Sequence, residues 1–110
     1  MRVISQDRTM DMPYEEVIIQ RFKSRIYFLN KNLTGVESLS DDMQIAEYST
    51  EEKAIKAMEM LREQHEKVAF LKTIINTEKG ASFVRGLSKT DFDKMTQNYF
   101  QFPQDDEIEV

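Results

Sequence analysis

The basic and aromatic residues between positions 21 and 31 come closest to a recognisable binding chemistry. Aromatic rings stack on bases while cations contact phosphates, so this pattern is a candidate surface for single-stranded nucleic acid. The chain as a whole has a net charge of −5, however, and salt-sensitive binding to phosphates needs positive surroundings. We therefore favour a solvated hairpin tip whose rings belong to the core. The candidate contacts are Arg21, Lys23, Arg25 and Lys31, interleaved with Phe22, Tyr27 and Phe28.

The carboxylates offer a second candidate chemistry. Paired acids do general acid/base work when burial raises one pKa, but these acids fall in a predicted loop, a helix start and the C-terminal end. The last group could imitate phosphates and occupy a basic groove of a partner, as an acidic inhibitor would. Such a tail more often serves solubility. The acids concerned are Asp41, Asp42, Glu51, Glu52, Asp105, Asp106, Glu107 and Glu109.

His65 is the only histidine, and the chain has no cysteine. No carboxylate stands at a helix spacing from His65 that would complete a metal site, so we interpret it as a packing or surface residue. The glycines, Gly35, Gly80 and Gly86, are too far apart for a phosphate-binding loop. The sequence therefore predicts no catalytic, cofactor-binding or metal-binding residue, and we expect a non-enzymatic protein.

The clearest element is a short strand that runs into a helix, over residues 45–65. Ser49 and Glu52 have the spacing of a capping box. Between 67 and 75 the pattern permits either a continued helix or a separate strand, and we favour the helix because no Gly or Pro intervenes. One apolar stripe is expected to face the core: Ala54, Ala57, Met58, Leu61, His65 and Val68.

Further apolar residues of this helix lie outside the stripe, and a small sheet cannot cover them all. Apolar surface of this kind marks interaction faces, so we expect self-association as a homodimer. The candidate face consists of Ile55, Met60, Phe70 and Ile74.

The remaining pattern predicts one α+β domain over residues 1–103. Strands are expected at 2–6, 9–12, 16–22, 25–30 and 43–48, with turns at Asp7-Arg8 and Lys23-Ser24 and with Pro13 at a sheet edge. They suggest a small antiparallel sheet of about four strands, packed by the long helix. A short second helix from Thr90 and a mobile acidic tail, 104–110, follow unless Ile108 and Val110 pair with a sheet edge.

No run approaches the roughly 18 apolar residues of a membrane span, and the N-terminal residues lack the apolar core of a signal peptide. The absence of cysteine fits a reducing compartment. We therefore expect a cytoplasmic protein with no membrane partner.

Four segments resemble a set of small uncharacterised proteins encoded in prophages and other mobile elements of Gram-positive bacteria. They are Met1-Arg-Val-Ile-Ser-Gln-Asp, Asp11-Met-Pro-Tyr-Glu, Ile26-Tyr-Phe-Leu and Ile45-Ala-Glu-Tyr-Ser-Thr-Glu-Glu-Lys-Ala. The likeness covers residues 1–65, and Arg8 stands where the set often has Gly. It implies no activity and no functional residues. It does imply a context, in which a protein–protein interaction module is the expected function.

Overall fold

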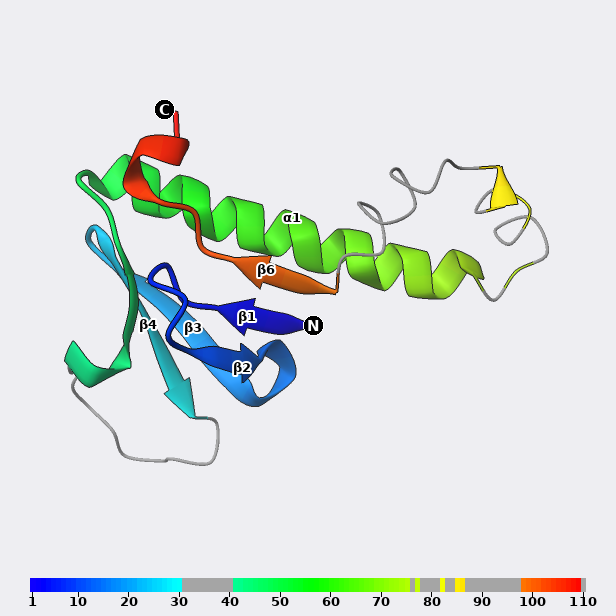
Figure 1. Cartoon of the computed structure of the whole chain (residues 1–110), viewed down its shortest axis with the longest axis horizontal. Coiled ribbons are helices and arrows are strands. Elements are labelled where there is room, and N and C mark those ends of the chain that lie inside the picture. Colours follow the sequence, from blue (N-terminus) through cyan, green and yellow to red (C-terminus); the bar gives the residue numbers. More distant parts are fainter. Residues whose placement is uncertain (31–40, 76, 78–81, 83–84, 87–97, 110) are drawn as a thin grey trace.

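The computed structural model describes residues 1–30, 41–75, 77, 82, 85–86 and 98–109 (Figure 1). These residues form an α+β fold with one long helix and six short strands, which confirms the predicted class. The strands are β1 (Arg2–Ile4), β2 (Asp11–Pro13), β3 (Val17–Phe22), β4 (Arg25–Asn30), β5 (Gln44–Glu47) and β6 (Tyr99–Gln101). The helix is α1 (Glu51–Ile75), and three 3₁₀ turns are η1 (Tyr14–Glu16), η2 (Asp41–Met43) and η3 (Asp105–Glu107).

The strands form two three-stranded sheets rather than the single sheet of about four strands that was expected. One has the order β2-β1-β6 and the other β3-β4-β5. β6 runs parallel to β1, with Val3 opposite Phe100. A three-residue strand carries almost no periodic signal, and its partner lies at the other end of the chain, so local pattern could not reveal this pair. The predicted helix from Thr90 lies outside the described residues.

The first hairpin confirms the predicted turn at Asp7-Arg8, although its strands are shorter than expected. The Asp7 carboxylate accepts hydrogen bonds from the Ser5 hydroxyl (2.7 Å) and from both the amide (3.0 Å) and hydroxyl (2.7 Å) of Thr9. Bonds from Thr9 and Ser5 lower the pKa of Asp7 to about 2. Arg8 follows with a φ of 66°. Pro13 ends β2, which is an edge strand as predicted.

The second hairpin has the predicted two-residue turn at Lys23-Ser24, with Phe22 opposite Arg25. Lys23 has a φ of 55°, and a positive φ at a central residue is what the tight two-residue hairpin turns require. Burial along β3 alternates strictly, with the odd-numbered residues half-buried and the even-numbered residues exposed. β5 then pairs antiparallel with β4 and leads to the helix.

α1 continues to Ile75, so residues 67–75 are helical as favoured. The capping prediction is wrong by one residue, because the Thr50 hydroxyl accepts from the Lys53 amide (3.2 Å). Ser49 instead donates its own amide to the Asp105 carboxylate (2.6 Å). The Asp105 carboxylate thus accepts the Ser49 N–H that the Glu52 side chain would accept in a capping box, and Asp105 is too far away in the sequence for a local pattern to reveal it.

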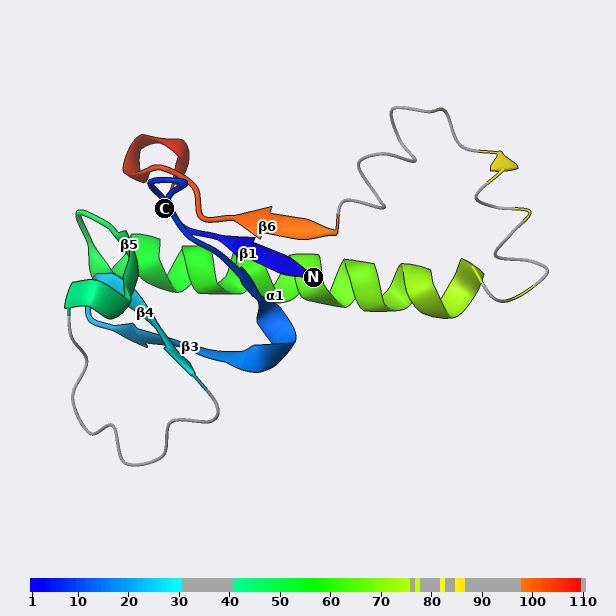
Figure 2. The ribbon, with the colours of Figure 1, turned by 60° about the horizontal axis from the view of Figure 1, so that its bottom comes forward.

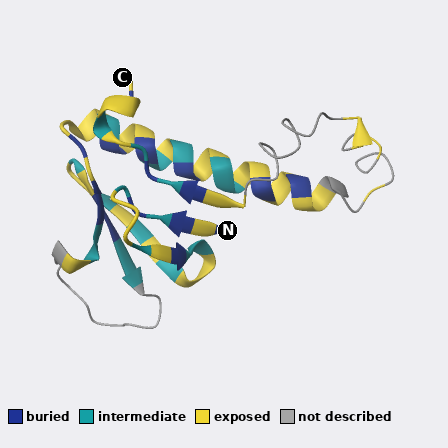
Figure 3. Ribbon diagram, in the orientation of Figure 1, coloured by how far each residue is buried: buried dark blue, intermediate teal, exposed yellow. Residues whose placement is uncertain are grey.

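The core lies where α1 meets both sheets. In the view of Figure 2, β1 and β6 run along one side of α1, and β3 and β4 lie along the other. The buried side chains of α1 form one stripe, visible in Figure 3. Fully buried residues from the strands and the C-terminal segment complete the core: Val3, Ile26 and Phe102.

The residues after Pro103 pack on this body instead of extending from it. Ile108 is buried in the core, and the Lys53 ammonium contacts both the backbone carbonyl (2.8 Å) and the carboxylate (3.2 Å) of Asp105. The Gln104 side-chain amide donates to the Gln6 backbone carbonyl (2.6 Å). The predicted domain boundary at residue 103 thus separates residues that are in contact.

Candidate functional site

The outer edge of β3 is the longest strand edge that remains unpaired in the described part of the chain. In a two-residue hairpin the residues flanking the turn exchange both backbone hydrogen bonds. Phe22, Gln20 and Ile18 therefore direct their backbone groups at β4. Ile19 and Arg21 direct theirs outward, and no described residue pairs with them.

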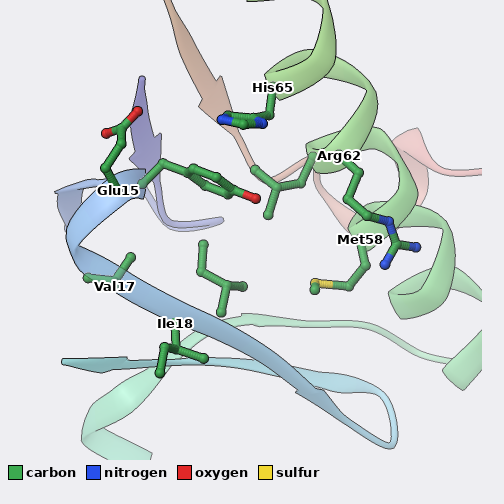
Figure 4. Close-up of a pocket in the computed structure, with 9 residues that line it drawn as sticks. Glu15, Val17, Ile18, Met58, Arg62 and His65 are labelled. Atoms are coloured by element: carbon green, nitrogen blue, oxygen red, sulfur yellow. The ribbon is translucent and has the colours of Figure 1, made fainter. Parts of the chain in front are cut away.

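An open pocket of about 550 Å³ lies beside this edge (Figure 4). Three consecutive residues of β3, Val17–Ile19, border it, while no residue of β4 does. Alternate residues of a strand face opposite ways, so three in a row border a pocket only along the strand's edge. The pocket is therefore a groove beside β3, not a hollow over the face of the sheet.

α1 forms the opposite wall of the groove. Met58, Leu61, Arg62 and His65 line it at three- and four-residue steps, which place them along one side of the helix. Figure 4 shows Met58 and His65 pointing toward the segment that carries Glu15, Val17 and Ile18, whereas the Arg62 side chain extends along the helix side of the groove. The wall is apolar at Met58 and Leu61 and cationic at Arg62.

Side-chain contacts lie at one end of the groove and beyond its lining residues. At one end the Tyr14 ring packs on the His65 ring, with centroids 4.4 Å apart and planes inclined by 31°. Beyond the lining residues, toward the start of α1, the Arg21 guanidinium pairs with Glu51 (2.8 Å). His65 is thus a half-buried packing residue, one of the two roles expected for it.

Arg62 supplies the uncompensated charge of the groove. Its side chain is exposed, and it makes no ion pair within the described chain. The Glu15 carboxylate, by contrast, accepts from the Met1 α-amino group (2.9 Å), and this bond lowers the pKa of Glu15. Arg62 is therefore the cationic side chain that the helix contributes to the groove.

The structure separates the residues predicted to contact nucleic acid. Arg21 faces α1 and pairs with Glu51, whereas Arg25 pairs with Glu47 (3.5 Å). The Lys23 ammonium lies 5.5 Å from the centroid of the Phe22 ring. Lys31 lies outside the described residues. Two of the cations are accordingly matched with carboxylates, and the described set makes no single basic face.

The predicted self-association residues are not brought together either. Ile55 and Met60 lie about 140° apart around α1, at about 100° per residue. Met60 packs against the core, while Ile55 is exposed. Phe70 is the most exposed large apolar residue described, at 61%. Ile74 belongs to α1, but its side chain is not described.

Metal and membrane chemistry find no support in the described part of the chain. No three acidic or histidine side chains there are arranged to hold a metal ion. Within the same residues, no helix is long and apolar enough to cross a membrane.

Sequence reasoning missed the groove because its residues carry no shared motif. Val17 and Ile19 read as ordinary strand residues, and Arg62 as part of a solvated helix face. The helical spacing of Met58, Arg62 and His65 does place them on one side of a helix. The strand that lies opposite that side, however, is determined by the fold and cannot be recognised from local sequence. Comparisons of the chain with protein-family models, curated proteins and solved structures found no match.

Proposed function

We propose that this chain is a non-enzymatic protein–protein interaction module that binds an extended segment of a partner protein as an added strand along β3. The observation that carries this proposal is the unpaired β3 edge at Ile19 and Arg21, which borders a groove walled by α1. Strand addition draws affinity from backbone hydrogen bonds and specificity from pockets for alternate side chains. This groove offers both.

The length of the β3 edge indicates the length of the ligand. The α1 residues that line the groove, from Met58 to His65, cover about 10 Å at 1.5 Å per residue. The β3 edge has six residues, and at about 3.3 Å per residue its length of about 20 Å sets the length of an added strand. The expected ligand is therefore an extended segment of about that length.

The test begins with selection of binders from a displayed library of random decapeptides, using the wild-type chain as bait. Binding of the selected peptides is then measured by fluorescence anisotropy. Ile19→Pro removes an outward N–H that the β3–β4 ladder does not use, and we expect it to weaken binding at least tenfold. Ile19→Val keeps the N–H and is the matched control, with folding of both variants checked by circular dichroism.

A second measurement on the wild type does not depend on any variant. Backbone amide exchange at Ile19 and Arg21 should be fast in the free protein and slow when a peptide is bound. Exchange at Gln20 should be slow in both states, because its N–H already bonds to β4. Peptides that bind without slowing exchange at Ile19 and Arg21 would show that strand addition is the wrong mode.

The wider setting rests on the sequence. The resemblance to mobile-element proteins supports a cytoplasmic protein from a phage or mobile element of a Gram-positive bacterium. Self-association is supported by exposed Phe70, and light scattering of wild type and Phe70→Glu would test it. The nucleic-acid alternative is weaker because Arg21 and Arg25 are ion-paired. The acidic-inhibitor alternative is weaker because the Asp105 carboxylate contacts Ser49 and Lys53.

A further inference from the structure

We infer that the segment added to β3 alternates apolar residues with a carboxylate that pairs with Arg62. This inference rests on the proposed function and names the chemistry of its ligand. Its occupant is thus an acidic, apolar-alternating segment of another protein.

The apolar half of the inference follows from the groove surface. Every second side chain of an added strand points toward α1. There it meets Met58 and Leu61 from the helix and Ile19 from β3. Methionine adapts its shape to different apolar partners, so this surface accepts branched or unbranched side chains.

The acidic half follows from charge complementarity. Arg62 lines the groove with no ion pair among the described residues, while the nearby Glu15 is engaged by the Met1 α-amino group. An arginine guanidinium matches a carboxylate with two parallel hydrogen bonds. A lysine or arginine at the same place in the ligand would meet an unbalanced positive charge.

The same charge argues against a second copy of this chain as the occupant. Antiparallel pairing of two β3 edges about Ile19 would place Arg62 of both copies close to the two-fold axis, where like charges repel. The β3 residues that border the groove are Val17, Ile18 and Ile19, and none carries a carboxylate. A second β3 strand therefore lacks the group that Arg62 requires.

The test compares decapeptide selections on the wild type, on Arg62→Glu and on Lys67→Glu. Lys67 is an exposed cation of α1 with no ion pair in the described chain, about 140° from Arg62 around the helix. Both substitutions change the net charge equally. We expect Asp and Glu to be enriched on the wild type and on Lys67→Glu, and Lys and Arg on Arg62→Glu. A wild-type binder should lose about tenfold in affinity for Arg62→Glu alone, which is about 1.4 kcal/mol.

The possible failures are distinct. Peptides that depend on the Ile19 N–H but show no acidic preference and no response to Arg62→Glu would overturn this inference and leave the proposed function standing. If Ile19→Pro does not weaken binding of the selected peptides, and if these peptides leave amide exchange at Ile19 and Arg21 unchanged, then both the proposed function and this inference are wrong. If light scattering gives the wild type twice the mass of one chain and gives Ile19→Pro the mass of one chain, then a second copy of the protein occupies the groove.

Discussion

The two flanks of α1 differ in how completely their strands are paired. On one flank β1 is covered on both sides, by β2 and by β6, and the outer strands of that sheet are only three residues long. On the other flank β3 presents a six-residue edge with no described partner. Proteins usually protect strand edges by shortness, proline or cover. The first flank uses shortness and Pro13, whereas β3 has neither in its described residues, and this contrast supports the proposal that a partner strand adds there.

The flank that carries β1, β2 and β6 is also stabilised by hydrogen bonds between segments that are distant in sequence. The Tyr48 hydroxyl (2.8 Å) and the Gln6 side-chain amide (3.2 Å) both donate to the Pro103 carbonyl. The Gln6 side-chain oxygen accepts from the Glu47 amide (2.9 Å). The described buried side-chain polar atoms all have partners. The unpaired strand edges on this side are only three residues long, whereas the β3 edge has six residues.

The largest expected effect is a difference in the free energy of unfolding between a substitution on one flank and a substitution on the other. Phe102 is fully buried and packs edge-on against Phe100, with ring centroids 5.1 Å apart. Phe102→Ala should cost about 3–5 kcal/mol of unfolding free energy, because it deletes a buried ring and leaves a cavity. Phe22→Ala, on the exposed face of β3, should change it by about 0.5 kcal/mol or less. Urea denaturation of both variants measures the difference.

Equal losses in these two variants would contradict the comparison, since they would mean that Phe22 is covered in solution. Such a result would point to an occupied β3 face and would direct attention to the oligomeric state.

A smaller effect on stability is expected from loss of the hydrogen bond between the Tyr48 hydroxyl and the Pro103 carbonyl. Tyr48→Phe keeps the buried ring and removes the donor to the Pro103 carbonyl, which retains the Gln6 amide as a partner. The loss should be about 1 kcal/mol, the usual net value of one hydrogen bond. Burial, and then the nearby Asp105 and Glu107 carboxylates, raise the pKa of Tyr48, so the hydroxyl stays protonated and able to donate. Thermal or urea unfolding detects the change, and an unaltered midpoint would show that the contact adds nothing.

The smallest effect concerns acid stability at the β1–β2 turn. The pKa of Asp7 falls from 3.8 to about 2 in the folded chain, so the folded state binds this proton less readily than the unfolded state. The resulting stabilisation is fully present above pH 3.8 and is lost as the pH falls toward 2. Asp7→Asn should therefore flatten the pH dependence of unfolding in that window. A curve of unchanged slope would mean that other carboxylates, such as Asp105, dominate it.

The parts of the fold that were predictable are those set by neighbours in sequence. Helical periodicity predicts α1 to Ile75, and the β-branched and aromatic runs around Lys23-Ser24 predict the β3–β4 hairpin. The parts that were missed depend on distant segments. β6 pairs with β1, and Asp105 takes the Ser49 amide, leaving Thr50 as the cap.

The candidate site follows the same division. The types and spacing of Arg21, Lys23 and Arg25 drew attention to a basic hairpin, but ion pairs with Glu51 and Glu47 form only in the folded chain. Arg62 resembled a solvated helix residue because nothing local reveals that β3 lies opposite it. A groove between two elements is a property of their docking, and single-sequence patterns do not encode it.

The parallel pairing of β1 with β6 has a consequence for how the chain is made. A ribosome releases β1 among the first residues and β6 only after residue 101 has emerged. Until then β1 can pair with β2 alone. The Phe102 ring, which is fully buried in the core, emerges after β6. Native compaction of this flank therefore waits until residue 102 has emerged, and nascent chains halted before that point would be exposed to chaperones and proteases.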